Sequence, residues 1–417
     1  MPDRIIIDFG DEQEKKQNPE EERIIIELDK ENKKIDVGEI EESREKKILN
    51  SKINSFYKGN SGLSSYFESG LKFPEGIEKG FRIKYAIDLG DEFLNSILEN
   101  NRYFILSSKS GKIFLTDRFT GKINESIFFE NETFEKTGLV FENRIYINSL
   151  KKIYELGKIG ISKQVIYNSS DNQYIWSNLN RHEDKLVFSE YDPGSGNASF
   201  KAIRLNENHG IKEFNFKVRS FLSDSLCIAF GKSYLLSDEK LIEYDFGKSS
   251  GEIFDTGIET NENSIMFFSN GRLYLTTSAN ELYYLDLPSD NYKFRYTGIK
   301  DPYLNSAGGF ADNLFTGTID GWKFFKAGGM QVFRFDDESE NKIECISKNV
   351  LVVSQKNKIV FCNLNRFQEA ESSIISSENE NKSEEIVSAL ISGNEIAVLT
   401  TSGLLKVFTN DKLNIHI

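Results

Sequence analysis

The chain has few of the residues on which several classes of function depend. Its 417 residues include only three cysteines, three histidines, three methionines and six prolines. The cysteines, Cys227, Cys345 and Cys362, form no CxxC pair, and none lies near a histidine at metal-ligand spacing. A disulfide framework and a zinc site are therefore not predicted. We expect no metal, no cofactor and a reducing, cytoplasmic compartment.

Long apolar runs are also missing. No stretch approaches the roughly 18 consecutive apolar residues of a membrane span. The first apolar run is short and is followed by acidic residues, which is not the pattern of a signal peptide. The net charge of −13 and the pI of about 5.1 oppose a role that depends on binding phosphates. We expect no membrane partner and no nucleic-acid partner.

Aromatic and β-branched residues are abundant instead. The chain has 33 Phe and 17 Tyr, and 38% of its residues are hydrophobic, which favours strands joined by polar turns. From Asn95 onward, pairs of strand-like runs separated by a polar turn recur with a spacing near 40 residues. The eight hairpin turns lie at Gly111, Lys151, Gly196, Lys240, Asn280, Gly321, Asn357 and Gly403.

This repeat length predicts the fold. The eight hairpins are spaced on average about 42 residues apart, which is the length of a four-stranded propeller blade. A single sheet cannot cover both of its faces, whereas a ring of blades buries each sheet between two neighbours. We predict an all-β fold, a closed β-propeller of four-stranded antiparallel blades over residues 81–417. Eight blades are expected, with seven as the alternative.

The segment RIKYAIDLG, Arg82 to Gly90, is surplus to the first blade, which already has four candidate strands. A ring must join its ends to protect its edge strands. We therefore predict that Arg82 to Leu89 pairs with the C-terminal blade. The segment Lys412 to Ile417 competes for the same edge.

One blade carries a family resemblance. The segment SGKIFLTDRFTGK resembles the blade motif of quinoprotein-dehydrogenase-like propellers, a PQQ-like repeat, and the matching residues are Gly111, Asp117, Thr120 and Gly121. Weaker matches to the motif are EKLIEYDFGKSSGEIF, NELYYLDLPSD and SGLLKVFTND. The resemblance implies a propeller fold. It does not imply quinone chemistry, because the chain lacks the secretory signal and the adjacent cysteine pair found in many of those enzymes.

Residues 1–80 are predicted to be an acidic, mostly disordered tail with two short hydrophobic motifs. The phrase RIIIDFG at Arg4 is repeated as RIIIELD at Arg23. We interpret both as segments that add as strands to the sheet edge of a partner protein. The alternative is that they pair with each other or with the chain's own propeller. The predicted partner-binding residues are Ile5, Ile6, Ile7, Phe9, Ile24, Ile25, Ile26 and Leu28.

Catalytic patterns are weak. His182, His209 and His416 are separated by whole blades and have no companion acids or thiols at ligand spacing. The leading hypothesis is a non-catalytic protein–protein interaction scaffold or adaptor, in which a rigid propeller presents loops and the tail carries linear motifs. The alternative is a propeller that senses a small molecule in its central channel. An enzyme with a site on one propeller face is the third hypothesis.

Overall fold

The computed structural model of the chain describes residues 81–409 and the backbone of two short strands near the N-terminus. Within 81–409 the residues outside the description are 143, 158–162, 206–209, 290, 302–303, 305, 327–328, 337–339, 356–357, 366–367 and 374–384. The chain divides into two compact units, Met1–Ser51 and Lys52–Ile417. In the first unit, β1 (Arg4–Ile5) and β2 (Ile26–Glu27) form a two-stranded antiparallel sheet.

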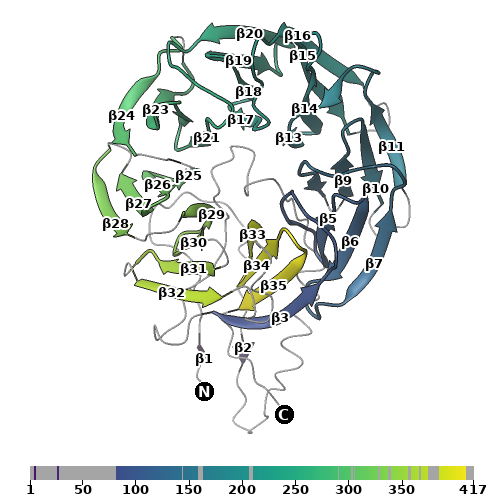
Figure 1. Cartoon of the computed structure of the whole chain (residues 1–417), viewed down its shortest axis with the longest axis vertical. Coiled ribbons are helices and arrows are strands. Elements are labelled where there is room, and N and C mark those ends of the chain that lie inside the picture. Colours follow the sequence, from purple (N-terminus) through teal and green to yellow (C-terminus); the bar gives the residue numbers. More distant parts are fainter. Residues whose placement is uncertain are drawn as a thin grey trace. The chain divides into compact units, whose positions relative to one another are not determined.

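In the second unit, eight antiparallel sheets are arranged in a ring (Figure 1). The strands of blades 1 to 4, from the inside of the ring outward, are β4 (Leu98–Glu99), β5 (Tyr103–Ser107), β6 (Lys112–Asp117) and β7 (Ile123–Phe128); β8 (Leu139–Phe141), β9 (Arg144–Asn148), β10 (Lys152–Leu156) and β11 (Lys163–Asn168); β12 (Tyr174–Ile175) with β13 (Asn180–His182), β14 (Lys185–Asp192), β15 (Asn197–Arg204) and β16 (Ile211–Lys217); and β17 (Cys227–Ala229), β18 (Lys232–Ser237), β19 (Lys240–Asp245) and β20 (Ser250–Asp255).

Blades 5 to 8 follow in the same order. Their strands are β21 (Met266–Ser269), β22 (Arg272–Thr276), β23 (Glu281–Asp286) and β24 (Arg295–Lys300); β25 (Ser306–Phe310), β26 (Asn313–Thr318), β27 (Gly321–Lys326) and β28 (Gln331–Asp336); β29 (Lys342–Ile346), β30 (Val350–Gln355), β31 (Lys358–Asn363) and β32 (Gln368–Ser373); and β33 (Ile386–Ser392), β34 (Glu395–Thr400), β35 (Leu404–Thr409) and β3 (Arg82–Asp88). The predicted eight-bladed, all-β propeller is confirmed, and the alternative of seven blades is wrong.

Blade 3 departs from the regular pattern because its inner strand is split. Both β12 and β13 pair with β14. Between them, the Trp176 indole nitrogen donates to the carbonyl of Leu222 at 2.6 Å, and the Ser177 hydroxyl accepts from the backbone N–H of Ser189 at 2.9 Å. The segment therefore turns toward blade 4 before it returns to its own sheet.

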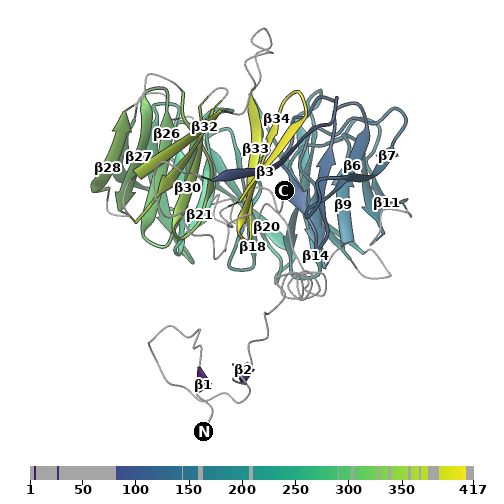
Figure 2. The same ribbon diagram turned by 90° about the horizontal axis from the view of Figure 1, so that it is seen from below.

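The core lies between the blades. Figure 2 shows the ring from the side, with the blades next to one another around it. Every residue of β5 and of β30 is buried, because each middle strand is covered on both faces by neighbouring sheets. In such strands, apolar residues do not alternate with polar residues that face solvent. Truncating one of their Leu or Ile side chains to Ala typically lowers the free energy of unfolding by about 2–5 kcal/mol.

The ring is closed by the strand that precedes the first blade. β3 pairs antiparallel with β35, from Arg82 opposite Thr409 to Asp88 opposite Leu404. The outermost strand of the last blade thus comes from the start of the propeller, as predicted. The competing segment, residues 412–417, lies outside the described residues.

Candidate functional site

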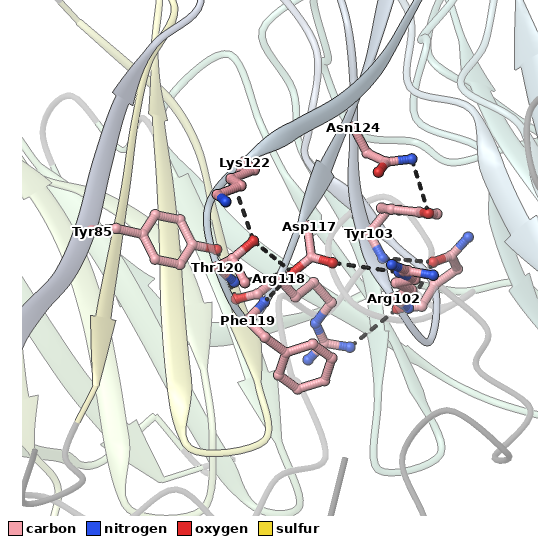
Figure 3. Close-up of polar contacts among 10 residues, drawn as sticks. Tyr85, Arg102, Tyr103, Asp117, Arg118, Phe119, Thr120, Lys122 and Asn124 are labelled. Carbon is pink, nitrogen blue, oxygen red and sulfur yellow. Dashed lines mark hydrogen bonds and ion pairs between the residues drawn. The ribbon is translucent and has the colours of Figure 1, made fainter. Parts of the chain in front are cut away.

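The residues of the family resemblance build a turn. Asp117 Oδ1 accepts from the backbone N–H groups of Phe119 and Thr120, both at 3.0 Å, and from the Thr120 hydroxyl at 3.1 Å (Figure 3). Burial alone would raise the pKa of Asp117, but these hydrogen bonds lower it below 3.8. The turn recurs in blade 4, where Asp245 Oδ1 accepts from the backbone N–H groups of Gly247 and Lys248. The motif is therefore structural and presents no reactive group.

The same turn receives the closing strand. The Tyr85 hydroxyl on β3 donates to the carbonyl of Arg118 at 2.9 Å (Figure 3). Gly121, at φ +73°, leaves room for the Tyr85 ring, because an added Cβ would lie 2.7 Å from Tyr85 Cδ2. Burial and the nearby Glu395 carboxylate raise the pKa of Tyr85. This contact joins the last blade to the first.

A buried ion pair within blade 1 lies at the same junction. Arg118 lies 3.2 Å from Glu99 Oε2 and also donates to the Ser392 hydroxyl on β33. Burial raises the pKa of Glu99. Nearby, Lys84 on β3 pairs with Glu395 at 2.6 Å. These charges hold the two ends of the ring together and are already paired.

An aromatic arc lies at the ends of the inner strands of five consecutive blades. We use this name for Phe141, His182, Phe230, Phe268 and Phe310, each of which lies at the last position of the inner strand of its blade, from blade 2 to blade 6, or within one residue of that position. Four of the five are half-buried. The corresponding ends of blades 7, 8 and 1 carry Ile346, Ser392 and Glu99. The arc therefore covers one side of the ring only.

The rings of the arc contact one another and their neighbours. Phe230 meets Phe268 edge to face, with the ring centroids 5.5 Å apart. His182 stacks on Phe246 at 4.4 Å, and the Arg181 guanidinium lies 3.5 Å from the Phe141 ring centroid. Burial lowers the pKa of His182 below 6.5, so this imidazole is neutral at physiological pH. Aromatic and Arg side chains of this kind are enriched at protein-binding hot spots.

Phe230 stands out within the arc. Its side chain is 57% exposed, and its φ is +48°, in the left-handed region that a bulky L-residue rarely adopts. The equivalent turn positions in four other blades hold Glu142, Glu183, Asn270 and Ala311, all with φ between 48° and 51°. Only blade 4 places a large apolar ring there among these turns. Strain and exposure together motivate a functional hypothesis.

A second feature lies at the opposite ends of the inner strands. An axial cavity of about 250 Å³ is lined by residues at the starts of the inner strands of blades 1, 4, 5, 6, 7 and 8. Its walls are mostly hydroxyl, carboxylate and backbone groups. Because β25 begins with Ser306 at this cavity and ends with Phe310 in the arc, the two features are roughly 13 Å apart along that strand.

Hydroxyl and amide side chains near the starts of the inner strands join neighbouring blades. Thr137 Oγ1 accepts from the backbone N–H of Ser96 at 3.0 Å, between blades 2 and 1. The bonds of the same kind are Thr137 N–H to Asn178 Oδ1 at 2.7 Å, Ile97 N–H to Ser388 Oγ at 3.3 Å and Ile343 N–H to Ser306 Oγ at 2.7 Å. The cavity wall is therefore fixed by hydrogen bonds between blades.

The predicted tail motifs are described only in part. Arg4 pairs with Glu27, and Ile5 with Ile26, so the two motifs pair with each other here. Ile6, Ile7, Phe9, Ile24, Ile25 and Leu28 lie outside the described residues, as does the predicted boundary between tail and propeller. The binding of these motifs to a partner stays a prediction. Sequence reasoning missed the arc and did not identify the residues that line the cavity, although aligning the repeats would have shown an aromatic residue before each of several inner turns.

The other groups considered for chemistry take structural positions. All three cysteines are buried and free of disulfides, and burial raises the pKa of the Cys227 and Cys345 thiols. Within the described part of the chain, no three His, Cys, Asp or Glu side chains gather where they could hold a metal ion. No helix there is long and apolar enough to cross a membrane.

Solved structures share the fold. The computationally designed Ika8 protein is 12% identical, with a TM-score of 0.61 over 77% of this chain and 97% of that chain. BamB from Moraxella catarrhalis is also 12% identical, with a TM-score of 0.56 over 79% of this chain and 99% of that chain. No protein-family model and no curated protein sequence matches the chain. At 12% identity, the likeness to these two structures shows only that the chain folds as a β-propeller.

Proposed function

We propose that the chain is a non-catalytic protein-binding scaffold whose aromatic arc contacts a partner protein. The observation that carries the proposal is Phe230, an exposed ring held at a turn position that favours Asn or Gly. Its left-handed conformation costs roughly 1–2 kcal/mol. The edge-to-face contact with Phe268 offsets about 0.5–1.5 kcal/mol of this cost. The Phe230 ring is still 57% exposed, so a binding role accounts for the residue better than stability does.

The partner is proposed to present an apolar segment with basic side chains. Phe141, Phe230 and Phe310 supply apolar contact area at the ends of rigid strands, which limits the entropy lost on binding. The turn residues Glu183 and Asp184 are exposed beside the arc. Charges of this kind at the rim steer a basic partner and affect the association rate more than the affinity.

The expectations on location, on excluded partners, on catalysis and on the propeller family are also part of the proposal. A cytoplasmic location is supported by three buried cysteines that form no disulfide, and the net charge of −13 argues against nucleic acid and anionic membranes. The absence of catalysis is supported by His182, which stacks on Phe246, and by cysteine thiols that burial keeps protonated. Membership of the quinoprotein-like propellers is supported by the turn shared by Asp117 and Asp245.

Affinity capture with matched variants tests the scaffold. The Phe230→Asn variant keeps the turn conformation and removes the ring. Ile253→Asn removes an apolar side chain that is 45% exposed on β20 of the same blade. We expect the partner to bind the Ile253→Asn variant as tightly as the unmodified chain. Its affinity for the Phe230→Asn variant should be about tenfold or more lower, as for the loss of a hot-spot residue. Equal binding to both variants would contradict the proposal.

A further inference from the structure

The outermost strand of each blade leaves one sheet edge without a partner strand in the described part of the chain. Natural proteins often interrupt such edges with β-bulges, which hinder pairing with another chain. A register shift interrupts the outermost pairing in blades 1, 2, 5, 6 and 8. The outermost strands of blades 3, 4 and 7, which are β16, β20 and β32, pair without such a shift. These three edges are the regular ones, and the side chains of β32 lie outside the description.

The edges of β16 and β20 differ in charge. β16 is the longer strand, with seven residues, and it exposes side chains of both signs, namely Lys212, Glu213 and Lys217. β20 exposes Glu252 and Asp255 and has no basic residue. Two copies of β20 would therefore bring like charges together, which is destabilising, whereas two copies of β16 can match opposite charges.

Alternate residues of β16 direct their backbone groups to the open edge. The backbone N–H of Val218 donates to the carbonyl of Gly196 at 2.9 Å, so the even-numbered residues bond to β15. Antiparallel strands exchange hydrogen bonds with one neighbour at every second residue. The N–H and C=O groups of Glu213, Asn215 and Lys217 therefore point away from the sheet and are available to another strand.

The edge is complementary to itself in one antiparallel register. With a two-fold axis at Asn215, Glu213 of each copy lies opposite Lys217 of the other copy. On the other face of the strand, Phe214 of each copy lies opposite Phe216 of the other. Directly opposed charges of opposite sign and aromatic pairs stabilise antiparallel strands. The edge-facing residues of the two copies would exchange about six backbone hydrogen bonds.

β16 is held in position for such pairing. An added Cβ on Gly251 of the next blade would lie 2.3 Å from Phe214 Cδ1, so the Phe214 ring packs closely on that blade. Glu213 pairs with Lys201 and accepts from Asn215 Nδ2 at 3.2 Å, and its side chain is still 45% exposed. A carboxylate has further acceptor sites. The hydrogen bonds from Lys201 and Asn215 lower the pKa of Glu213, so this carboxylate is charged at neutral pH.

Lys217 has no acid of its own to pair with. Its Nζ donates to the carbonyl of Ser195 at 3.4 Å and forms no ion pair within the described part of the chain. We propose that a second copy of this chain adds its β16 to this edge, which gives a two-fold symmetric dimer with one sheet continuous across two blades. The edge lies on the outside of the ring (Figure 1), on a different strand from the aromatic arc, so the inference goes beyond the scaffold function.

Sedimentation equilibrium of the full chain tests the dimer, at up to about 200 μM because a small interface associates weakly. Asn215→Pro removes the edge-facing N–H at the two-fold axis and no bond to β15, so the strand tolerates it. This variant should be monomeric, with the melting temperature of the unmodified chain. Ile253→Pro makes the same change on the regular edge of β20, where Thr256 N–H bonds to the carbonyl of Glu239 and Ile253 therefore faces outward. It should dimerise like the unmodified chain.

Charge variants test the register independently. Glu213→Lys and Lys217→Glu each place like charges opposite one another in both ion pairs, and each should weaken self-association about tenfold or more. An equimolar mixture of the two variants restores opposite charges in both pairs and should associate like the unmodified chain. This mixture also decides the question if Asn215→Pro does not fold.

Three results would overturn the inference. A chain that is monomeric at every concentration would leave the edge to a strand from another protein. A dimer that persists in Asn215→Pro would show that the copies meet at another surface. Charge variants that do not associate when mixed would exclude the register with Glu213 opposite Lys217. None of these results would affect the Phe230 test, which measures binding of a different protein.

Discussion

Gly121→Ala is the substitution that best tests how the ring is closed. The added Cβ would lie 2.7 Å from Cδ2 and 2.8 Å from Cγ of Tyr85. These atoms are at the base of the ring, and the ring is anchored by the bond from its hydroxyl to Arg118. It cannot turn aside without losing that bond, so the strand β3 must move away from blade 1.

The expected loss in the free energy of unfolding of the Gly121→Ala variant has two parts. Alanine in the left-handed conformation at φ +73° costs roughly 1–2 kcal/mol. Displacing Tyr85 from its packed position adds about 1–3 kcal/mol, as overpacking does elsewhere. Gly121→Ala should therefore lower the free energy of unfolding by about 2–5 kcal/mol. Gly257→Ala is the matched control, because Gly257 has φ +63° and nothing within 4 Å of an added Cβ.

Urea denaturation of four variants isolates the contact. Gly257→Ala should cost roughly 1–2 kcal/mol, which is the conformational part alone. In a Tyr85→Ala background, Gly121→Ala should cost the same small amount, which gives a coupling energy of about 1–3 kcal/mol in the double-mutant cycle. Equal losses for Gly121→Ala and Gly257→Ala, or an additive cycle, would refute the view that Tyr85 holds the first and last blades together.

Three other predictions concern the ends of the chain and the arc. Deleting Arg82–Asp88 should lower the free energy of unfolding by roughly several kcal/mol, because the ladder with β35 is lost, and an unchanged urea midpoint would contradict this. Replacing Ile5, Ile6 and Ile7 by Ser should leave the melting temperature unchanged and weaken a partner interaction; a shift of several degrees would instead place the motif in the fold. His182 has a pKa lowered by burial, so the unfolded chain binds its proton more readily, and stability should fall as the pH decreases below about 6.5. His182→Phe should remove that part of the pH dependence in thermal melts, and an identical pH profile would show that His182 does not contribute.

The repeat pattern was enough to predict the ring because it depends on local signals. Each hairpin carries its own turn residues, and Gly111 and Gly403 adopt the positive φ expected at the tips. The closing role of Arg82 to Leu89 followed from counting strands, since a fifth strand in blade 1 had no place. These features need only information from within one repeat or one chain end.

Contacts between blades were not predicted. Glu243 accepts hydrogen bonds from Lys232 in its own blade and from Tyr292, which follows blade 5's third strand. The two partners of this carboxylate are separated by 60 residues, and strand periodicity does not determine which side chains meet over such distances. The cavity depends on the same kind of contact. The arc was missed because its most exposed member, Phe230, occupies a turn position that holds no aromatic residue in the other blades with this turn.

Site-specific photo-crosslinking tests the central functional claim most directly. p-Benzoylphenylalanine would replace Phe230 in one sample and Ile253 in another, and each purified full chain would be irradiated in extract from the source cells. The account predicts one discrete crosslinked protein at position 230 that is absent at position 253, since only the former lies in the arc. No adduct at position 230, or the same adducts at both positions, would contradict the claim that the aromatic arc is the binding surface.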